Sequence, residues 1–217
     1  SLDTTYPTLI TGVLTLTSAS SNFGTDPAVQ FSSGGRQVSF AIPAGSLDAV
    51  FPSGSTQIRL QSGTAAGTIT VTPGFSSGPN GAMDITPQNA KTLQLVIPPL
   101  APVLLTASLG TRTFTSFSIL VSGYSTNRFL DHLTVQFTPA SGVSIGSGSA
   151  TIDVSAAARI WFQSVASQNL GGQFSIELPF TLGNGSVGTD LTKSLSGVTI
   201  TATNETGTSN AVKVSIP

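Results

Sequence analysis

Apolar and polar residues alternate along most of the chain with a period of two, the period of a half-buried β-strand. In residues 9–17, Ile10, Leu14 and Leu16 fall on one face of the predicted strand, and threonines occupy most of the other face. Short strands separated by Gly, Pro and Ser turns predict an all-β protein built from antiparallel sandwiches or barrels. The further segments with strand character are residues 37–42, 56–61, 67–72, 92–97, 103–109, 114–122, 133–138, 150–154, 174–182, 198–203 and 211–216.

A proline-rich segment interrupts this rhythm near the middle of the chain. Pro98, Pro99 and Pro102 fall within five residues, and a central strand cannot continue through them because each proline removes a ladder donor. Such a segment forms a stiff, extended connector. We therefore predict two domains, residues 1–98 and 99–217, whose sequences do not align with each other.

One segment breaks the strand pattern. Within residues 156–166, Ala158, Trp161, Phe162 and Val165 recur at helical spacing, which predicts a short helix between two strands. A strand through Trp161 is the alternative that the pattern leaves open.

Several segments made of turn residues and core aromatics occur together in a known kind of module. They are residues 40–46 (FAIPAGS), 49–52, 60–69, 123–128 (GYSTNR), 161–164 (WFQS) and 178–180. Together they resemble the tandem Ig-like modules at the C-terminal end of large secreted and surface proteins of soil bacteria. The resemblance implies two tandem Ig-like, fibronectin-III-like antiparallel β-sandwiches joined by the proline-rich connector. It also implies an extracellular, stalk-like or adhesive role, and it supplies no active site.

Composition narrows the class of partner. Charged residues make up only 8% of the chain, the net charge is −1 and cysteine is absent. There is no basic patch of the kind that nucleic acid requires, no disulfide framework and no thiolate metal site. No run of apolar residues is long enough to predict a transmembrane segment. A chain kept in solution by hydroxyl groups rather than charges is typical of an extracellular or cell-surface protein, and near-zero net charge makes self-association easy.

The candidate catalytic groups do not form a recognisable set. The single histidine, His132, follows Asp131, and on a strand two adjacent side chains would point to opposite faces. Ser76 and Ser144 lie in G-x-S-x-G patterns, but neither pattern leads from a strand into a helix as a nucleophile elbow must. The carboxylates are dispersed. We predict no catalytic residue, no cofactor and no metal site, and therefore a protein that is not an enzyme.

Two alternatives of this kind stay open. A calcium site would draw its oxygens from the loops at residues 21–26 and 184–190, which have one carboxylate each. An isopeptide bond would use Lys213 with Glu177 as the catalytic acid, although Lys213 alternates with two valines and is expected to face solvent.

Four residues are candidates for contact with sugars. Tyr124 and Trp161 are the candidate stacking platforms for a polysaccharide, with Tyr124 expected in an exposed turn and Trp161 able to serve as a core residue instead. Asn184 and Asn204 begin N-x-S/T sequons in predicted loops and are candidate glycosylation sites.

These observations predict a non-catalytic structural or adhesive protein that associates with copies of itself into a surface filament or array through β-strand edges. The terminal segments 8–18 and 211–216 are the candidates for strand addition to a neighbour. The alternative is a polysaccharide-binding module of a larger secreted protein, with a surface glycan as its partner.

Overall fold

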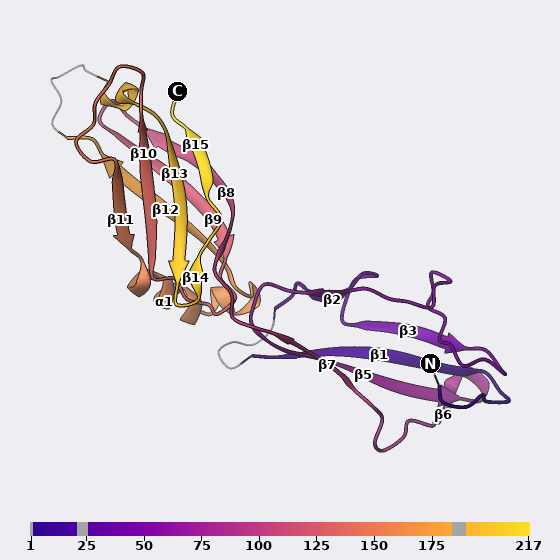
Figure 1. The fold of residues 1–217 in the computed structure, drawn as a ribbon. Helices are drawn as coiled ribbons and strands as arrows, with labels where there is room; N and C mark the ends of the chain where they lie inside the picture. Colours follow the sequence, from indigo (N-terminus) through magenta and orange to yellow (C-terminus); the bar gives the residue numbers. More distant parts are fainter. Residues whose placement is uncertain (1, 21–25, 184–189) are drawn as a thin grey trace. The chain divides into compact units, whose positions relative to one another are not determined.

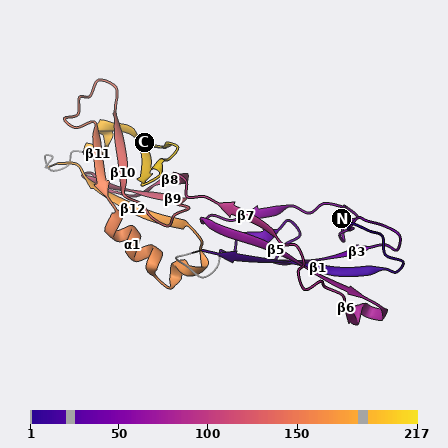
Figure 2. The same cartoon turned by 60° about the horizontal axis from the view of Figure 1, so that its bottom comes forward.

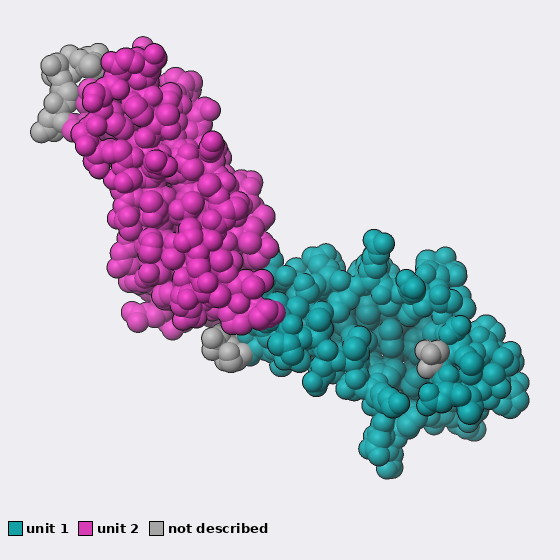
Figure 3. All heavy atoms as spheres, viewed as in Figure 1, with its two compact units in different colours: residues 1–97 teal, residues 98–217 magenta. Residues whose placement is uncertain are grey.

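A computed structural model describes residues 2–20, 26–183 and 190–217. The chain divides into two compact units, residues 1–97 and 98–217, coloured separately in Figure 3. Both units consist mainly of antiparallel strands, which confirms the predicted all-β class. That the two units are independent domains stays a prediction.

Unit 1 is built around one antiparallel sheet. Strand β1 is central, with β3 on one side and β5 on the other, and both β6 and β7 pair with the far side of β5 (Figure 1). Strands β2 and β4 form a separate two-stranded ladder. The elements are β1 (Ile10–Ala19), β2 (Val29–Phe31), β3 (Gln37–Ile42), β4 (Leu60–Ser62), β5 (Gly67–Ser77), the 3-10 turn Pro79–Gly81, β6 (Met83–Asp84) and β7 (Leu93–Ile97).

The core of unit 1 uses the predicted apolar stripes. Ile10 and Leu16 of β1 are buried with Phe40 of β3 and Ile69 of β5. The strand expected over residues 56–61 is shorter, because only Leu60 to Ser62 pair with β2.

Unit 2 consists of two sheets that face each other (Figure 1). One sheet has the order β12-β9-β8, and the other has the order β11-β10-β13, with β14 and β15 both paired to β13. The strands are β8 (Val103–Arg112), β9 (Ser116–Tyr124), β10 (His132–Pro139), β11 (Ser149–Asp153), β12 (Gln173–Thr181), β13 (Leu195–Asn204), β14 (Gly207–Thr208) and β15 (Val212–Ser215). The helical elements are α1 (Ser155–Gln163) and the 3-10 turns Ala166–Asn169 and Leu191–Ser194.

The core of unit 2 lies between these sheets. Ile119 and Val121 of β9 and Leu133 and Ile200 of the opposite sheet are completely buried. Phe114 lies outside β9, although the sequence pattern places it in the strand predicted over residues 114–122. It lies in the turn before β9 with 61% of its surface exposed.

The segment after β11 is helical, which decides between the two predictions for it. Helix α1 buries Ala158 and Phe162 and lies beside β12, as Figure 2 shows. A hydrogen bond from the backbone of Ser155 to the carboxylate of Asp153 supports its first turn.

Both terminal segments proposed for strand addition are integrated in their own sheets. Strand β1 pairs with β3 on one side and with β5 on the other, so it has no free edge along most of its length. Strand β15 pairs antiparallel with β13. Strand β1 is therefore excluded, whereas β15 has no second strand partner among the described residues and remains an edge that carries the charged residue Lys213.

Candidate functional site

The most open edge in unit 1 belongs to β7. Its five residues pair with Gly67 to Val71 of β5, and no other strand among the described residues pairs with it. Leu93 is 67% exposed, Leu95 41% and Val96 67%. The strand is apolar on both faces, and Gln94 is its only polar residue.

The register explains why these side chains are uncovered. Leu95 lies opposite Ile69, which is buried, so both side chains point to the core side of the sheet. The covering layer of unit 1 ends at β5, because Ile69 is fully covered and Leu95 beside it is not. Leu93 and Leu95 thus extend the core side of the sheet beyond the part that the unit itself encloses, Ile97 packs against the core, and Val96 lies on the opposite face.

The opposite edge of the same sheet is protected. Ala41 of β3 donates to Val50 at 2.9 Å and accepts from it at 2.7 Å, so a segment outside the named strands covers this edge. Natural sheets usually protect an edge by such a cover, by a charge or by a proline. Strand β7 has none of these within its five residues, and we regard it as the candidate interaction surface.

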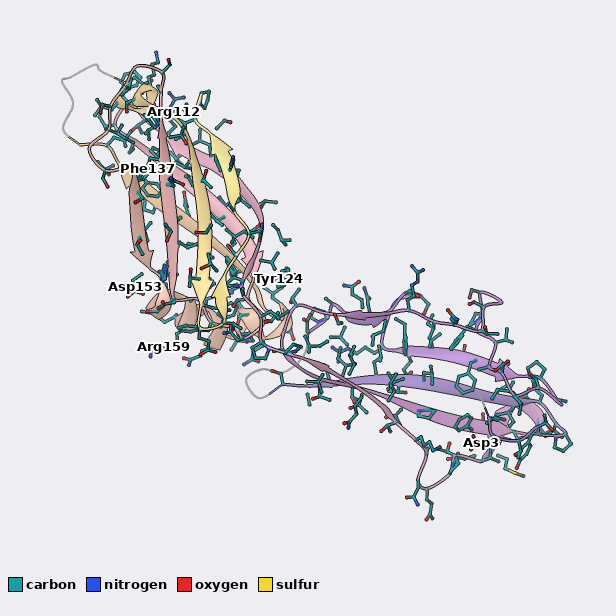
Figure 4. All side chains as sticks on the ribbon, viewed as in Figure 1. Asp3, Arg112, Tyr124, Phe137, Asp153 and Arg159 are labelled. Atoms are coloured by element: carbon teal, nitrogen blue, oxygen red, sulfur yellow. The ribbon has the colours of Figure 1, made fainter. Side chains whose placement is uncertain are left out.

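The two aromatic candidates of unit 2 meet at one residue. The indole N–H of Trp161 donates to the carbonyl oxygen of Gln173 at 2.9 Å, and Tyr124 is the register partner of Gln173. Tyr124 is the last residue of β9, half-buried, rather than part of an exposed turn (Figure 4). Trp161 is also half-buried and packs against the core.

Trp161 borders a cavity of unit 2. The cavity has a volume of about 210 Å³ and lies between α1 and β12. Its lining is almost wholly apolar and includes Ala157, Phe162, Phe174 and Ile176. Its chemistry suits the packing of hydrocarbon or one face of a ring, with Ser175 as the one residue of the lining that has a hydroxyl group.

The glycosylation candidate Asn204 requires a correction. The side chain is 3% exposed, and its amide nitrogen donates to Leu100, Ser125 and Asn127. A glycan on this nitrogen would remove a donor hydrogen and would need space that the folded unit does not have. Asn184 lies outside the described residues.

The histidine candidate also differs from its expectation. Nδ1 of His132 lies 2.9 Å from a carboxylate oxygen of Asp131. Asp131 precedes β10 and does not follow the alternation of the strand, so the two side chains meet instead of pointing apart. Asp153 is the register partner of His132, and hydrogen bonds from the hydroxyl and the N–H of Ser155 hold the pKa of Asp153 below its usual value.

The two serines with nucleophile-elbow patterns do not occupy elbows. Ser76 lies inside β5, and its hydroxyl forms a 2.9 Å hydrogen bond with Thr11. Ser144 is exposed in the loop between β10 and β11. Neither position leads into a helix, so neither has the strained geometry that exposes a nucleophile.

The isopeptide alternative does not fit the fold. Lys213 and Glu177 are both exposed, and they belong to β15 and β12 in opposite sheets of unit 2. The core separates the two side chains, and an isopeptide site needs its acid and lysine buried together.

The described part of the chain contains neither a candidate metal-ligand cluster nor a helix that could span a membrane. Residues 2–20, 26–183 and 190–217 contain no group of three or more His, Asp or Glu side chains that could hold a metal ion. Most of both loops named as calcium candidates lies outside these ranges. Within the same ranges, no helix is long and apolar enough to cross a membrane.

No protein-family model matches the chain, and no curated protein sequence matches it.

Proposed function

We propose that this chain is a non-catalytic structural or adhesive protein of the cell surface or extracellular space that associates with copies of itself through a strand edge. The observation that supports this most strongly is β7, an unpaired edge strand with three exposed apolar side chains and no charge. Exposed apolar edges of this kind pair with other chains unless the fold protects them.

The low charge of the chain supports the same proposal. With a net charge of −1 and 8% charged residues, long-range repulsion between copies is weak. Ser and Thr hydroxyls keep the remaining surface hydrated. Association through one edge is therefore not opposed by the rest of the molecule.

We also propose that each unit is an Ig-like β-sandwich. In unit 2, a three-stranded sheet β12-β9-β8 faces the strands β11-β10-β13-β15, an arrangement that is typical of Ig-like sandwiches. In the described part of unit 1, the only ladder outside the main sheet is the short pair β2-β4, so the Ig-like comparison there concerns an incomplete sandwich. Incomplete coverage is what leaves β7 available.

The test is the mass of the 217-residue chain as a function of its concentration at neutral pH. Sedimentation velocity is expected to give a monomer at low concentration and larger species as concentration rises, and negative-stain images would report their form. A monomer at every concentration that the protein tolerates would contradict the proposal.

A second candidate function is binding of a polysaccharide by unit 2. The observation that favours it is that Trp161 bonds the backbone of Gln173 and Tyr124 is the strand partner of Gln173, since aromatic side chains often line ligand sites. Co-sedimentation with insoluble glucans or chitin would test it. Tyr124→Ala should lower the bound fraction severalfold, whereas Phe114→Ala, at an exposed aromatic elsewhere in the unit, should not. Equal binding by both variants would exclude this site.

A further inference from the structure

We infer that β7 pairs with β7 of a second copy, antiparallel, across a two-fold axis at Leu95. This inference rests on the proposed function and specifies its contact. It predicts a continuous sheet in which β5 and β7 of one copy are followed by β7 and β5 of the other. The partner is a second copy of this chain, and the contact is isologous because each copy contributes the same residues.

The geometry of an antiparallel ladder restricts how β7 can meet its own copy. Directly opposite residues share one face of the sheet and use backbone groups that point toward each other. Because both properties alternate along a strand, odd-numbered residues can pair only with odd-numbered residues of the identical strand. Leu93, Leu95 and Ile97 of one copy therefore always meet the same three residues of the other, and the apolar core-side stripe becomes continuous.

The length of the strand selects the register. With Leu95 opposite Leu95, Leu93 faces Ile97 and Gln94 faces Val96, so all five residues of β7 are paired. Any shift in either direction leaves residues without a partner. Extension past Ile97 is prevented because Pro98 and Pro99 have no N–H to donate.

Charge favours a second copy over a different protein. In a two-fold contact the same short strand supplies both sides of the ladder, so a charge in β7 would place two like charges in one five-residue ladder, which is destabilising when they lie close together. Strand β7 has no charged residue, and the nearest one, Lys91, would lie beyond the ladder opposite Pro99. Strand β7 can therefore pair with its own copy without bringing like charges together within the ladder.

The contact is expected to be weak and closed. A five-residue ladder buries much less than the roughly 1,000 Å² of a stable interface, so the pair should form reversibly. An isologous contact also ends with two chains, whereas a filament needs a second, heterologous contact. This edge alone therefore gives pairs of chains, and dense display on a surface would strengthen them through effective concentration.

A single engineered cysteine tests the register, because the chain has no thiol of its own. Opposite Cα atoms in an antiparallel ladder are about 4.5–5.5 Å apart, within the range of a disulfide. Leu95→Cys should therefore form a covalent dimer under mild oxidation. Leu93→Cys is the matched control, because its two copies would lie about 13 Å apart along the strand. Its dimer should form at least about tenfold more slowly, since a disulfide cannot span that distance.

A charged edge provides the second measurement. Val96→Lys should weaken the concentration-dependent association at least about tenfold, since a lysine on an edge opposes pairing. Met83→Lys is the control, because Met83 is 63% exposed on β6 of the same sheet. Circular dichroism would verify that both variants fold.

The outcomes separate the two proposals. A chain that is monomeric at all concentrations overturns both. Association that is unchanged by Val96→Lys, with no dimer from Leu95→Cys, overturns the β7 contact and leaves self-association through another surface. Equal cross-linking of Leu93→Cys and Leu95→Cys overturns the two-fold register.

Discussion

The side-chain amide of Asn204 donates a 2.9 Å hydrogen bond to the carbonyl oxygen of Leu100, a residue 104 positions earlier in the chain. The same nitrogen lies 3.1 Å from Ser125 Oγ, and the amide oxygen accepts from the backbone of Thr206 and Gly207. One buried side chain thus joins the end of β13 to the start of unit 2 and to the loop after β9. The Asn204 side chain therefore stabilises the folded unit, and its burial argues against modification.

Removal of this amide should destabilise unit 2. Asn204→Ala leaves the backbone N–H groups of Thr206 and Gly207 without this acceptor, and the Leu100 carbonyl keeps only the 3.4 Å hydrogen bond from Thr126 Oγ1. An unsatisfied polar group costs about 1–3 kcal/mol when it is buried. We expect a total loss of roughly 2–4 kcal/mol in the free energy of unfolding. Urea denaturation followed by fluorescence of Trp161, the only tryptophan, measures it. Asn169→Ala, at an exposed asparagine of the same unit, is the control, and an equal effect of both variants would refute this role.

The same burial predicts that the Asn204 sequon stays unmodified. When the chain is secreted from a host that performs N-glycosylation, mass spectrometry of the folded fraction should find Asn204 without a glycan. Folded, fully occupied protein would contradict the buried position that the structure gives this residue.

A glycine in β1 should tolerate no side chain. A Cβ at Gly12 would lie 2.3 Å from the ring of Phe40 and 2.4 Å from the carbonyl oxygen of Gly74. Gly12→Ala should therefore cost unit 1 about 1–3 kcal/mol, the usual range for overpacking.

Gly74 in β5 supplies the matched control for this variant. A Cβ there would meet its nearest atom at 3.8 Å, which is ordinary contact, so Gly74→Ala should change stability little. Thermal unfolding followed by circular dichroism compares the two variants. If the units unfold independently, Gly12→Ala should leave the Trp161 fluorescence transition unchanged, because Trp161 belongs to unit 2. A shift of that transition would mean that the units unfold together.

A buried arginine should hold helix α1 in place. The guanidinium of Arg128 donates to the carbonyl oxygens of Phe162, Ser167 and Gly171, and it lies 5.3 Å from the ring centre of Phe162. A cation at the C-terminal end of a helix binds the carbonyls that have no partner within the helix. Arg128→Lys keeps the charge but cannot reach all three oxygens from one ammonium, so we expect a loss of about 2–4 kcal/mol.

Exchange measurements would locate that effect. Amide hydrogen exchange in the Arg128→Lys variant should accelerate in residues 155–170 more than in β13. Arg159→Lys is the control, because Arg159 is exposed on the same helix (Figure 4). Uniform acceleration across unit 2 would argue against a local role for Arg128.

The acid stability of unit 2 should depend on Asp190. A hydrogen bond from the Thr192 hydroxyl is the main cause that lowers the pKa of this carboxyl below 3.8, with Arg112 3.3 Å away adding to it. A carboxyl whose pKa is lower in the folded state contributes stability above about pH 3.8, and that contribution is lost as pH falls through the folded value. The Asp190→Asn variant should therefore unfold at a lower temperature than the parent at pH 7. This difference in unfolding temperature should shrink toward pH 2.5. A difference that grows on acidification would have the wrong sign.

The all-β class and many of the core positions can be predicted from the amino-acid sequence. Alternation in segments such as residues 9–17 and 37–42 predicted the buried faces of β1 and β3, because the side chains of a strand alternate regardless of its neighbours. Helical spacing around Trp161 likewise favoured the short helix that the structure contains, although the pattern left a strand open. Local periodicity contains this information because each pattern arises within a few consecutive residues.

Which strands lie at the centre of a sheet, and which polar groups bond to one another, depends on the tertiary structure. Residues 8–18 and 93–97 are both apolar strands, yet β1 became central and β7 became an edge, because coverage depends on segments that are distant in sequence. The sequence pattern places Asn204 in an exposed loop, but the side chain is buried. Its partners Leu100, Ser125 and Asn127 approach it only after the sheets have packed. Pairing between distant residues is a property of the folded chain. Both the proposed interaction surface, β7, and the buried hydrogen bonds of Asn204 depend on such pairing.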